Sequence, residues 1–190
     1  MGLTMRPSHP AVRGIGLSLR ADRDEIVAQW AGWVAAQMTA APQIERPTVV
    51  RQLTLLVDIM IEMTGPLRRR LLELWVNACS TYGRAAAERG LAAGEVVEEM
   101  QHLREILIRH LSETVSTLPA RQSMATVLRL NRVLDRGVTH AVVGYTDALV
   151  ETLLNQRGVP VPVEAPLAES LAGRLEQSET ELQRLRDLSL

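Results

Sequence analysis

The sequence predicts an all-α protein, and three observations support this. Apolar residues recur at intervals of three and four through most of the chain, and no stretch alternates apolar and polar side chains as a strand does. Phe is absent and the apolar content is mostly Leu, Val and Ala, which is typical of helix bundles. The segment from Tyr82 to Arg109 contains the end of one amphipathic helix, a turn marked by glycines and the start of a second helix.

The turn at Gly90 is predicted from its residue types. Gly90 follows the last residues of a helix and can adopt the left-handed conformation that ends one. The next helix opens with Glu95 in its first turns, where an acid suits the positive end of the helix dipole. It is expected to run to Leu118, before Pro119, with one apolar face that comprises Val96, Met100, Leu103, Leu107 and His110.

The other helices of the body are predicted from apolar stripes and their flanking residues. Three precede the turn: from Asp22 to about Ala41, from Pro47 to Gly65, and from Pro66 to Arg89. The longest helix follows, from Arg121 to Gln156, with a heptad-like seam at Val127, Asn131, Leu134, Val138, Ala141, Tyr145, Ala148 and Thr152. These five helices form a predicted domain over residues 22–158, and residues 1–21 are expected to be a flexible arm because they show no sustained period.

A second unit is predicted at the C-terminus. Residues 159–166 are a Pro-rich extended spacer. Residues 167–190 are helical again, and their leucines at intervals of four and three predict a coiled coil that links to a missing output domain. Homodimerisation is expected along the longest helix and this tail, through Leu134, Val138, Tyr145, Leu171, Leu175, Leu182 and Leu185.

Composition narrows the function. The net charge of −1 gives no general electrostatic case for binding nucleic acid or an anionic membrane. Cys79 is the one cysteine in 190 residues, so no intrachain disulfide forms, and its apolar neighbours favour a buried structural thiol. The chain lacks the pattern of a signal peptide and any apolar run of about 20 residues, the length of a membrane span. A cytoplasmic location is therefore expected.

Neither an enzyme nor a metal site is indicated. The chain contains no paired-His or CxxC metal pattern, no GxSxG nucleophile motif and no glycine-rich phosphate loop. We therefore expect no catalytic residues, no bound metal and no cofactor.

Two blocks of sequence resemble a known family. The first is the turn from Gly90 to Glu95 with the following Val96-Val97 and Glu99 to Arg104, and the second is Asn131 to Asp135 with Ala141 to Leu149. They are similar to the N-terminal sensor domain of RsbR-type stressosome proteins, the RsbRD N-terminal family, over roughly residues 24–157. The chain departs from the family at Met100, where relatives have an aromatic residue, and it contains no STAS output domain.

The resemblance implies a heme-free, globin-like bundle and a function. Such domains act as sensory and dimerisation modules of bacterial signal-transduction proteins, either stressosome-like regulators or histidine kinases. The tail from Glu179 to Arg186 resembles the linker that precedes a kinase dimerisation helix. A signal would shift the longest helix, and the coiled coil would pass the change to a downstream output domain or partner protein.

Two histidines give alternative functions. His102, on the exposed side of its helix, could make the chain a histidine phosphotransfer protein, although Glu98, Glu99 and Glu105 would repel a phosphoryl group. His110, on the apolar seam, could ligate heme in a gas or redox sensor, although a buried histidine satisfied by a neighbour is favoured. A ligand pocket between the later helices would be lined by Trp75, Cys79, Leu107, His110, Asn131 and Tyr145.

Overall fold

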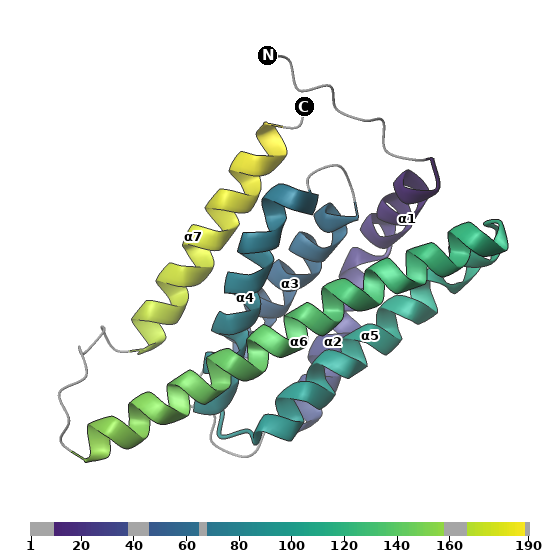
Figure 1. The fold of residues 1–190 in the computed structure, drawn as a ribbon. Coiled ribbons are helices and arrows are strands. Elements are labelled where there is room, and N and C mark those ends of the chain that lie inside the picture. Colours follow the sequence, from purple (N-terminus) through teal and green to yellow (C-terminus); the bar gives the residue numbers. More distant parts are fainter. Residues whose placement is uncertain (1–9, 38–45, 65–67, 158–166, 189–190) are drawn as a thin grey trace.

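The described residues, 10–37, 46–64, 68–157 and 167–188 of a computed structural model, form seven helices and no strand (Figure 1). The predicted all-α fold is confirmed. The helices are α1 (Pro10–Ala21), α2 (Arg23–Gln37), α3 (Arg46–Met63), α4 (Arg68–Glu88), α5 (Ala93–Ser116), α6 (Ala120–Gln156) and α7 (Leu167–Asp187).

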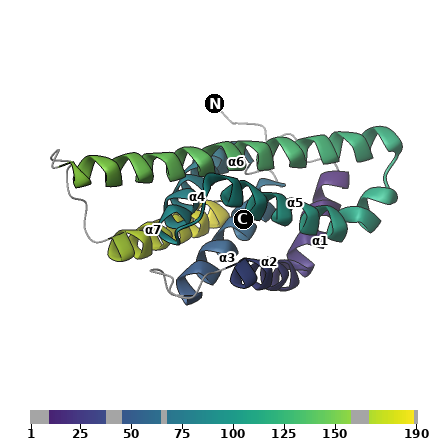
Figure 2. The same cartoon turned by 90° about the horizontal axis from the view of Figure 1, so that it is seen from below.

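The helix α4 occupies the centre of the bundle. It packs against α3, α5, α6 and α7, and its contact with α6 is the most extensive in the molecule. The helices α1 and α2 pack on α3 and α5. Figure 2 shows α6 running along one side of the body, with its C-terminal turns projecting beyond α4.

The first helix corrects one prediction. Residues 10–21 form α1 rather than a flexible arm, and Ile15 and Leu19 are buried in the core. Of the two glycines that obscured the helical period, Gly16 has a packing role, because a Cβ there would lie 2.8 Å from the hydroxyl oxygen of Thr64, just after α3. A Cβ on Gly14 would meet no atom within 4 Å. Residues 1–9, the rest of the predicted arm, lie outside the described part of the chain.

The turn between α4 and α5 forms as its sequence predicts. Gly90 has a φ of 79°, in the left-handed region. Its N–H donates to Ala87 O at 3.1 Å, and the N–H of Leu91 donates to Ala86 O at 3.2 Å, so the last carbonyls of α4 are satisfied. The Glu95 carboxylate then accepts the N–H of Ala92 at 2.6 Å, which caps the start of α5.

Glycines let α4 and α6 approach until their backbones touch. A Cβ on Gly83 would lie 1.7 Å from the Ala141 carbonyl oxygen, and a Cβ on Gly144 would lie 2.1 Å from the Ser80 carbonyl oxygen. No side chain fits at either position. Gly83 and Gly144 therefore hold the two helices in a single register.

This close contact decides which face of α6 is covered. Leu134, Ala141 and Tyr145 are buried in the body, and Val138 is partly buried against it. The centre of the predicted seam is thus a core-forming face, whereas Thr152 at its C-terminal end is exposed. Periodicity identified the seam correctly but could not tell which helix covers it.

Helix α7 also packs on the body. Its leucine stripe, predicted as a coiled coil, is buried against α3 and α4, at Leu171, Leu175, Leu182 and Leu185. The predicted spacer at residues 159–166 lies outside the described residues.

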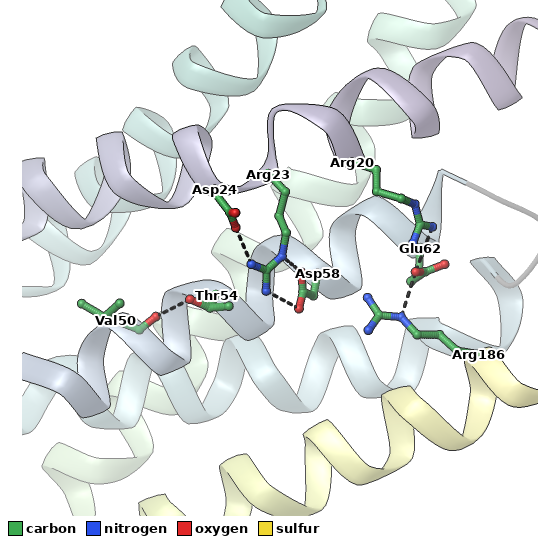
Figure 3. Close-up of polar contacts among 8 residues, drawn as sticks. All are labelled: Arg20, Arg23, Asp24, Val50, Thr54, Asp58, Glu62 and Arg186. Atoms are coloured by element: carbon green, nitrogen blue, oxygen red, sulfur yellow. Dashed lines mark hydrogen bonds and ion pairs between the residues drawn. The ribbon is translucent and has the colours of Figure 1, made fainter.

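Two acids of α3 bind arginines from three other helices (Figure 3). Asp58 accepts from Arg23 of α2 at 2.6 and 2.9 Å, and this hydrogen bonding raises the pKa of Arg23. Glu62 accepts from Arg20 of α1 at 3.0 Å and from Arg186 of α7 at 2.9 Å. The side of α3 that bears these acids therefore ties the N-terminal and C-terminal helices to one another.

Replacement of Gly144 by Ala should destabilise the protein by about 3 kcal/mol, because the added methyl group requires α6 to move off α4. Urea unfolding measures the change. Gly32→Ala on the exposed face of α2 is the matched control, since a Cβ there meets no atom within 4 Å. It should stabilise the protein by about 0.5–1 kcal/mol through helix propensity. Equal effects of the two substitutions would contradict the close contact.

Candidate functional site

The residues of the predicted ligand pocket fill the interior instead of lining one site. Trp75, Cys79 and Leu107 are fully buried, and a Cβ on Gly137 would lie 2.7 Å from the Trp75 ring and 3.1 Å from the Cys79 sulfur. The Trp75 Nε1–H donates to Val133 O at 3.0 Å, and the Tyr145 hydroxyl donates to Leu91 O at 2.8 Å. These bonds fix α6 against α4 and the turn. Asn131 is partly buried beside them, with its Oδ1 unpaired among the described residues.

His110 lies at a different place, where α1, α2 and α5 meet. Its Nδ1 is 3.1 Å from Asp22 Oδ2, and the nearby Thr114 hydroxyl donates to Ser18 Oγ at 3.1 Å. The His110 Nε2 is buried and has no partner among the described residues. This agrees with a boundary histidine that a neighbour satisfies, and heme ligation by His110 stays an untested alternative.

His102 is packed against a tryptophan. Its ring stacks on Trp33 of α2, with ring centroids 4.7 Å apart and planes inclined by 19°. Its Nδ1 lies 3.8 Å from a carboxylate oxygen of Glu105. This environment suits a side chain that joins α2 to α5, and the neighbouring acid would repel a phosphoryl group. Phosphotransfer through His102 stays untested.

A buried ion pair is the largest polar feature of the interior. Arg89 Nη1 and Nη2 donate to the two carboxylate oxygens of Glu99 at 2.8 and 2.6 Å, and both side chains are at most 2% exposed. The Tyr82 hydroxyl also donates to Glu99, and the Trp30 Nε1–H donates to Glu99 O at 2.9 Å. The cluster formed by Trp30, Tyr82, Arg89 and Glu99 connects α2, the end of α4 and the start of α5.

Burial sets the protonation of this cluster. It raises the pKa of the Tyr82 hydroxyl well above 10, and the negative Glu99 raises it further, so Tyr82 stays a donor. Burial lowers the pKa of Arg89, but the hydrogen bonds to Glu99 and the charges nearby more than offset this. The arrangement offers no exposed reactive atom, and its role is to lock the α4–α5 turn.

The burial of Glu99 was not predicted, although the sequence contains a signal for it. Glu99 lies three residues after Val96 and four before Leu103, which places it on the apolar face of α5 rather than off it. A charged residue on such a face needs a buried partner. Arg89, at the end of the preceding helix, was the available one.

A polar groove of about 380 Å³ lies between α4 and α7. Its polar walls come from both helices, with Asn77, Ser80 and Thr81 on one side and Gln177, Ser178 and Glu181 on the other. None of the six predicted pocket residues lines it.

The outer face of α6 is the most apolar exposed surface among the described residues. In its C-terminal half, five apolar side chains are 36% to 56% exposed: Val143, Leu149, Val150, Leu153 and Leu154. We call these five residues the α6 outer patch. Clustered exposed apolar side chains mark surfaces that bind other proteins. The patch is therefore the best candidate for a functional surface.

Within the described ranges, no group of three or more His, Cys, Asp and Glu side chains could hold a metal ion. In the same part of the chain, no helix combines the length and apolar character needed to span a membrane.

Replacement of Glu99 by Gln should cost about 3–5 kcal/mol of stability, because it leaves the Arg89 guanidinium buried without a counter-charge. The double variant Arg89→Met/Glu99→Gln should recover at least half of this loss. Arg104→Ala is the surface control: Arg104 pairs with the exposed Asp135, and its loss should cost less than about 1 kcal/mol. Urea midpoints give all three values, and a Glu99→Gln protein as stable as the control would refute the buried pair.

Stability should also fall at alkaline pH because of Cys79. Burial raises the pKa of this thiol, so the unfolded chain loses the proton first. The stabilising effect is complete below about pH 8.5 and declines by up to about 1.4 kcal/mol per pH unit above it. In Cys79→Ala, the free energy of unfolding should no longer decline between about pH 8.5 and 10. The decline caused by Tyr82 should begin near pH 10 in both proteins. Urea unfolding across this range tests it, and identical slopes would contradict a buried thiol.

Comparison with known proteins identifies the family. The profile described as "RsbT co-antagonist protein rsbRD N-terminal domain" matches residues 24–159, from the start of α2 to just beyond α6. Neither the curated proteins nor the solved structures contain a match to the chain. Because the matched segment covers more than half of the sequence, the chain belongs to the family of RsbRD N-terminal domains, which supports a stressosome-like signalling sensor.

Proposed function

We propose that this chain is the cytoplasmic sensory and dimerisation domain of a bacterial signal-transduction protein. Two copies associate through α6, and α6 and α7 pass the signal to an output domain, either of a histidine kinase or of a stressosome-like regulator. The domain itself catalyses no reaction and uses no cofactor, nucleic acid or membrane. The family match supports the sensor class, and the α6 outer patch supports the mode of association.

The patch is the observation that carries the dimer. Its five residues lie within a stretch of about three turns near the end of α6, on the side of the helix away from its contact with α4. Val143, Val150 and Leu154 follow each other at intervals of seven and four, so they share one line along the helix. A second α6 packed along this line would cover apolar surface that the body leaves exposed.

The same geometry gives α6 its signalling role. One face of α6 is locked to α4 by Gly83 and Gly144, so a displacement of α4 must move α6 as well. The opposite face carries the patch. A change in the sensor core would therefore alter how two copies of α6 meet.

Light scattering coupled to size exclusion tests the dimer. The full chain should elute as a dimer, and Leu153→Glu should weaken dimerisation at least tenfold, because a charge within an apolar contact is desolvated without a partner. At a protein concentration low enough that both proteins are monomeric, circular dichroism should show the same helix content and melting temperature.

The matched control is Leu128→Glu. Leu128 is 48% exposed on the same helix but lies outside the α6 outer patch, so its replacement should leave the dimer intact. A wild-type chain that stays monomeric at high concentration, or a Leu153→Glu dimer as tight as wild type, would overturn the proposed association.

A further inference from the structure

The apolar stripe of α7 suits two different partners. Its leucines, Leu171, Leu175, Leu182 and Leu185, are only 2% to 5% exposed because α3 and α4 cover them. Their spacing of three, four and seven residues is also that of a two-stranded coiled coil. The same side chains therefore fit either the α3–α4 surface or the α7 of a second copy, and they cannot be buried against both at once.

Ion pairs fix the position of α7 on α3. Arg51 Nε and Nη2 donate to the Glu179 carboxylate at 2.7 and 2.5 Å. Figure 3 shows the second pair, in which Arg186 Nε donates to Glu62 Oε1 at 2.9 Å. The Arg51–Glu179 pair is partly exposed on both sides. Such pairs set orientation and register more than they add stability.

The middle of the α7 contact is loosely packed. The polar groove between α4 and α7 opens at Ser178, the stripe position between Leu175 and Leu182 where a fifth leucine would fall. The apolar contacts of α7 are therefore concentrated toward its two ends. An interface with a polar hollow at its centre holds less tightly than a continuous core.

The contact of α6 with α4 is of the opposite kind. There, glycines bring two backbones together, whereas a Cβ on Gly173 of α7 would meet no atom within 4 Å. Helix α7 touches the body through side chains, and it can leave without breaking a backbone contact of this type. The fold thus combines a fixed long helix with a separable last helix.

We propose that α7 is a releasable helix, docked on α3 and α4 in one state and paired with α7 of a second copy in the other. The two states exclude each other because both bury the same four leucines. This proposal deepens the proposed function and rests on it, since it names the step that makes the coiled coil available to an output domain. While α7 is docked, α3 and α4 cover its leucines and no coiled coil can form. Once α7 is released, these leucines can pair with those of a second copy.

Crosslinking tests the docked state. In a Cys79→Ala background, Arg51→Cys/Glu179→Cys should form an intramolecular link with a short bismaleimide, in a yield independent of protein concentration. The control, Arg51→Cys/Thr180→Cys, places the second thiol at an exposed position about 100° around the helix. It should link much less. Links mainly between copies, or equal linking in the two proteins, would overturn docking.

Charge reversal tests release. Arg51→Glu removes the pair and places a like charge next to Glu179, so amide exchange across α7 should become about two- to fivefold faster at low protein concentration. Arg51→Glu/Glu179→Arg should restore the wild-type rate, which a general loss of stability would not do. Unchanged exchange in the single variant, or no restoration in the double variant, would refute the role of this pair in docking.

Self-association tests the second partner. At high concentration, Arg51→Glu/Leu153→Glu should dimerise through α7, whereas the chain crosslinked between positions 51 and 179 and carrying Leu153→Glu should stay monomeric. Dimerisation of both proteins, or of neither, would refute the exclusion between the two states. Leu153→Glu alone reports on α6, so failure of α7 docking and failure of the α6 dimer are read separately.

Discussion

The backbone contact between α4 and α6 governs the rest of the structure. Gly83 and Gly144 bring the two helices so close that neither position has room for a methyl group. This fixes which face of a 37-residue helix enters the core and which remains outside. Packing of this kind has only one register, so α4 and α6 behave as one rigid element on which the other helices are placed.

The helices themselves were largely predictable, since periodicity, proline and glycine mark their limits. The sequence placed the longest helix at Arg121 to Gln156, and α6 spans Ala120–Gln156. What periodicity cannot supply is the partner of an apolar face. The periodicity of the seam through Leu134 and Tyr145 fits a core face and a dimer contact equally well. The glycines at the contact between α4 and α6, Gly83 and Gly144, show that it faces the core. The first helix was missed because Gly14 and Gly16 interrupt its apolar pattern.

The candidate site was less predictable, for a physical reason. The pocket proposed from stripes required a gap between helices, but Trp75 fills the space that Gly137 leaves. The buried Arg89–Glu99 pair was hidden because charged residues are assigned to solvent by default, and their burial depends on a partner ten residues away across a turn. The α6 outer patch is a surface property, and it emerges only after the opposite face has been assigned to the core.

Glu62 has a consequence for the two ends of the chain. Its carboxylate is shared by Arg20, on the first helix, and Arg186, on the last, although 166 positions separate these arginines. Two cations that share one anion repel each other, so each weakens the interaction of the other with the anion. Removal of either cation strengthens the bond that remains. By thermodynamic reciprocity, an interaction that moves α1 away from Glu62 strengthens the bond between Arg186 of α7 and Glu62. An interaction that moves α7 away strengthens the bond between Arg20 of α1 and Glu62 in the same way. Helices α1 and α7 therefore compete for one carboxylate.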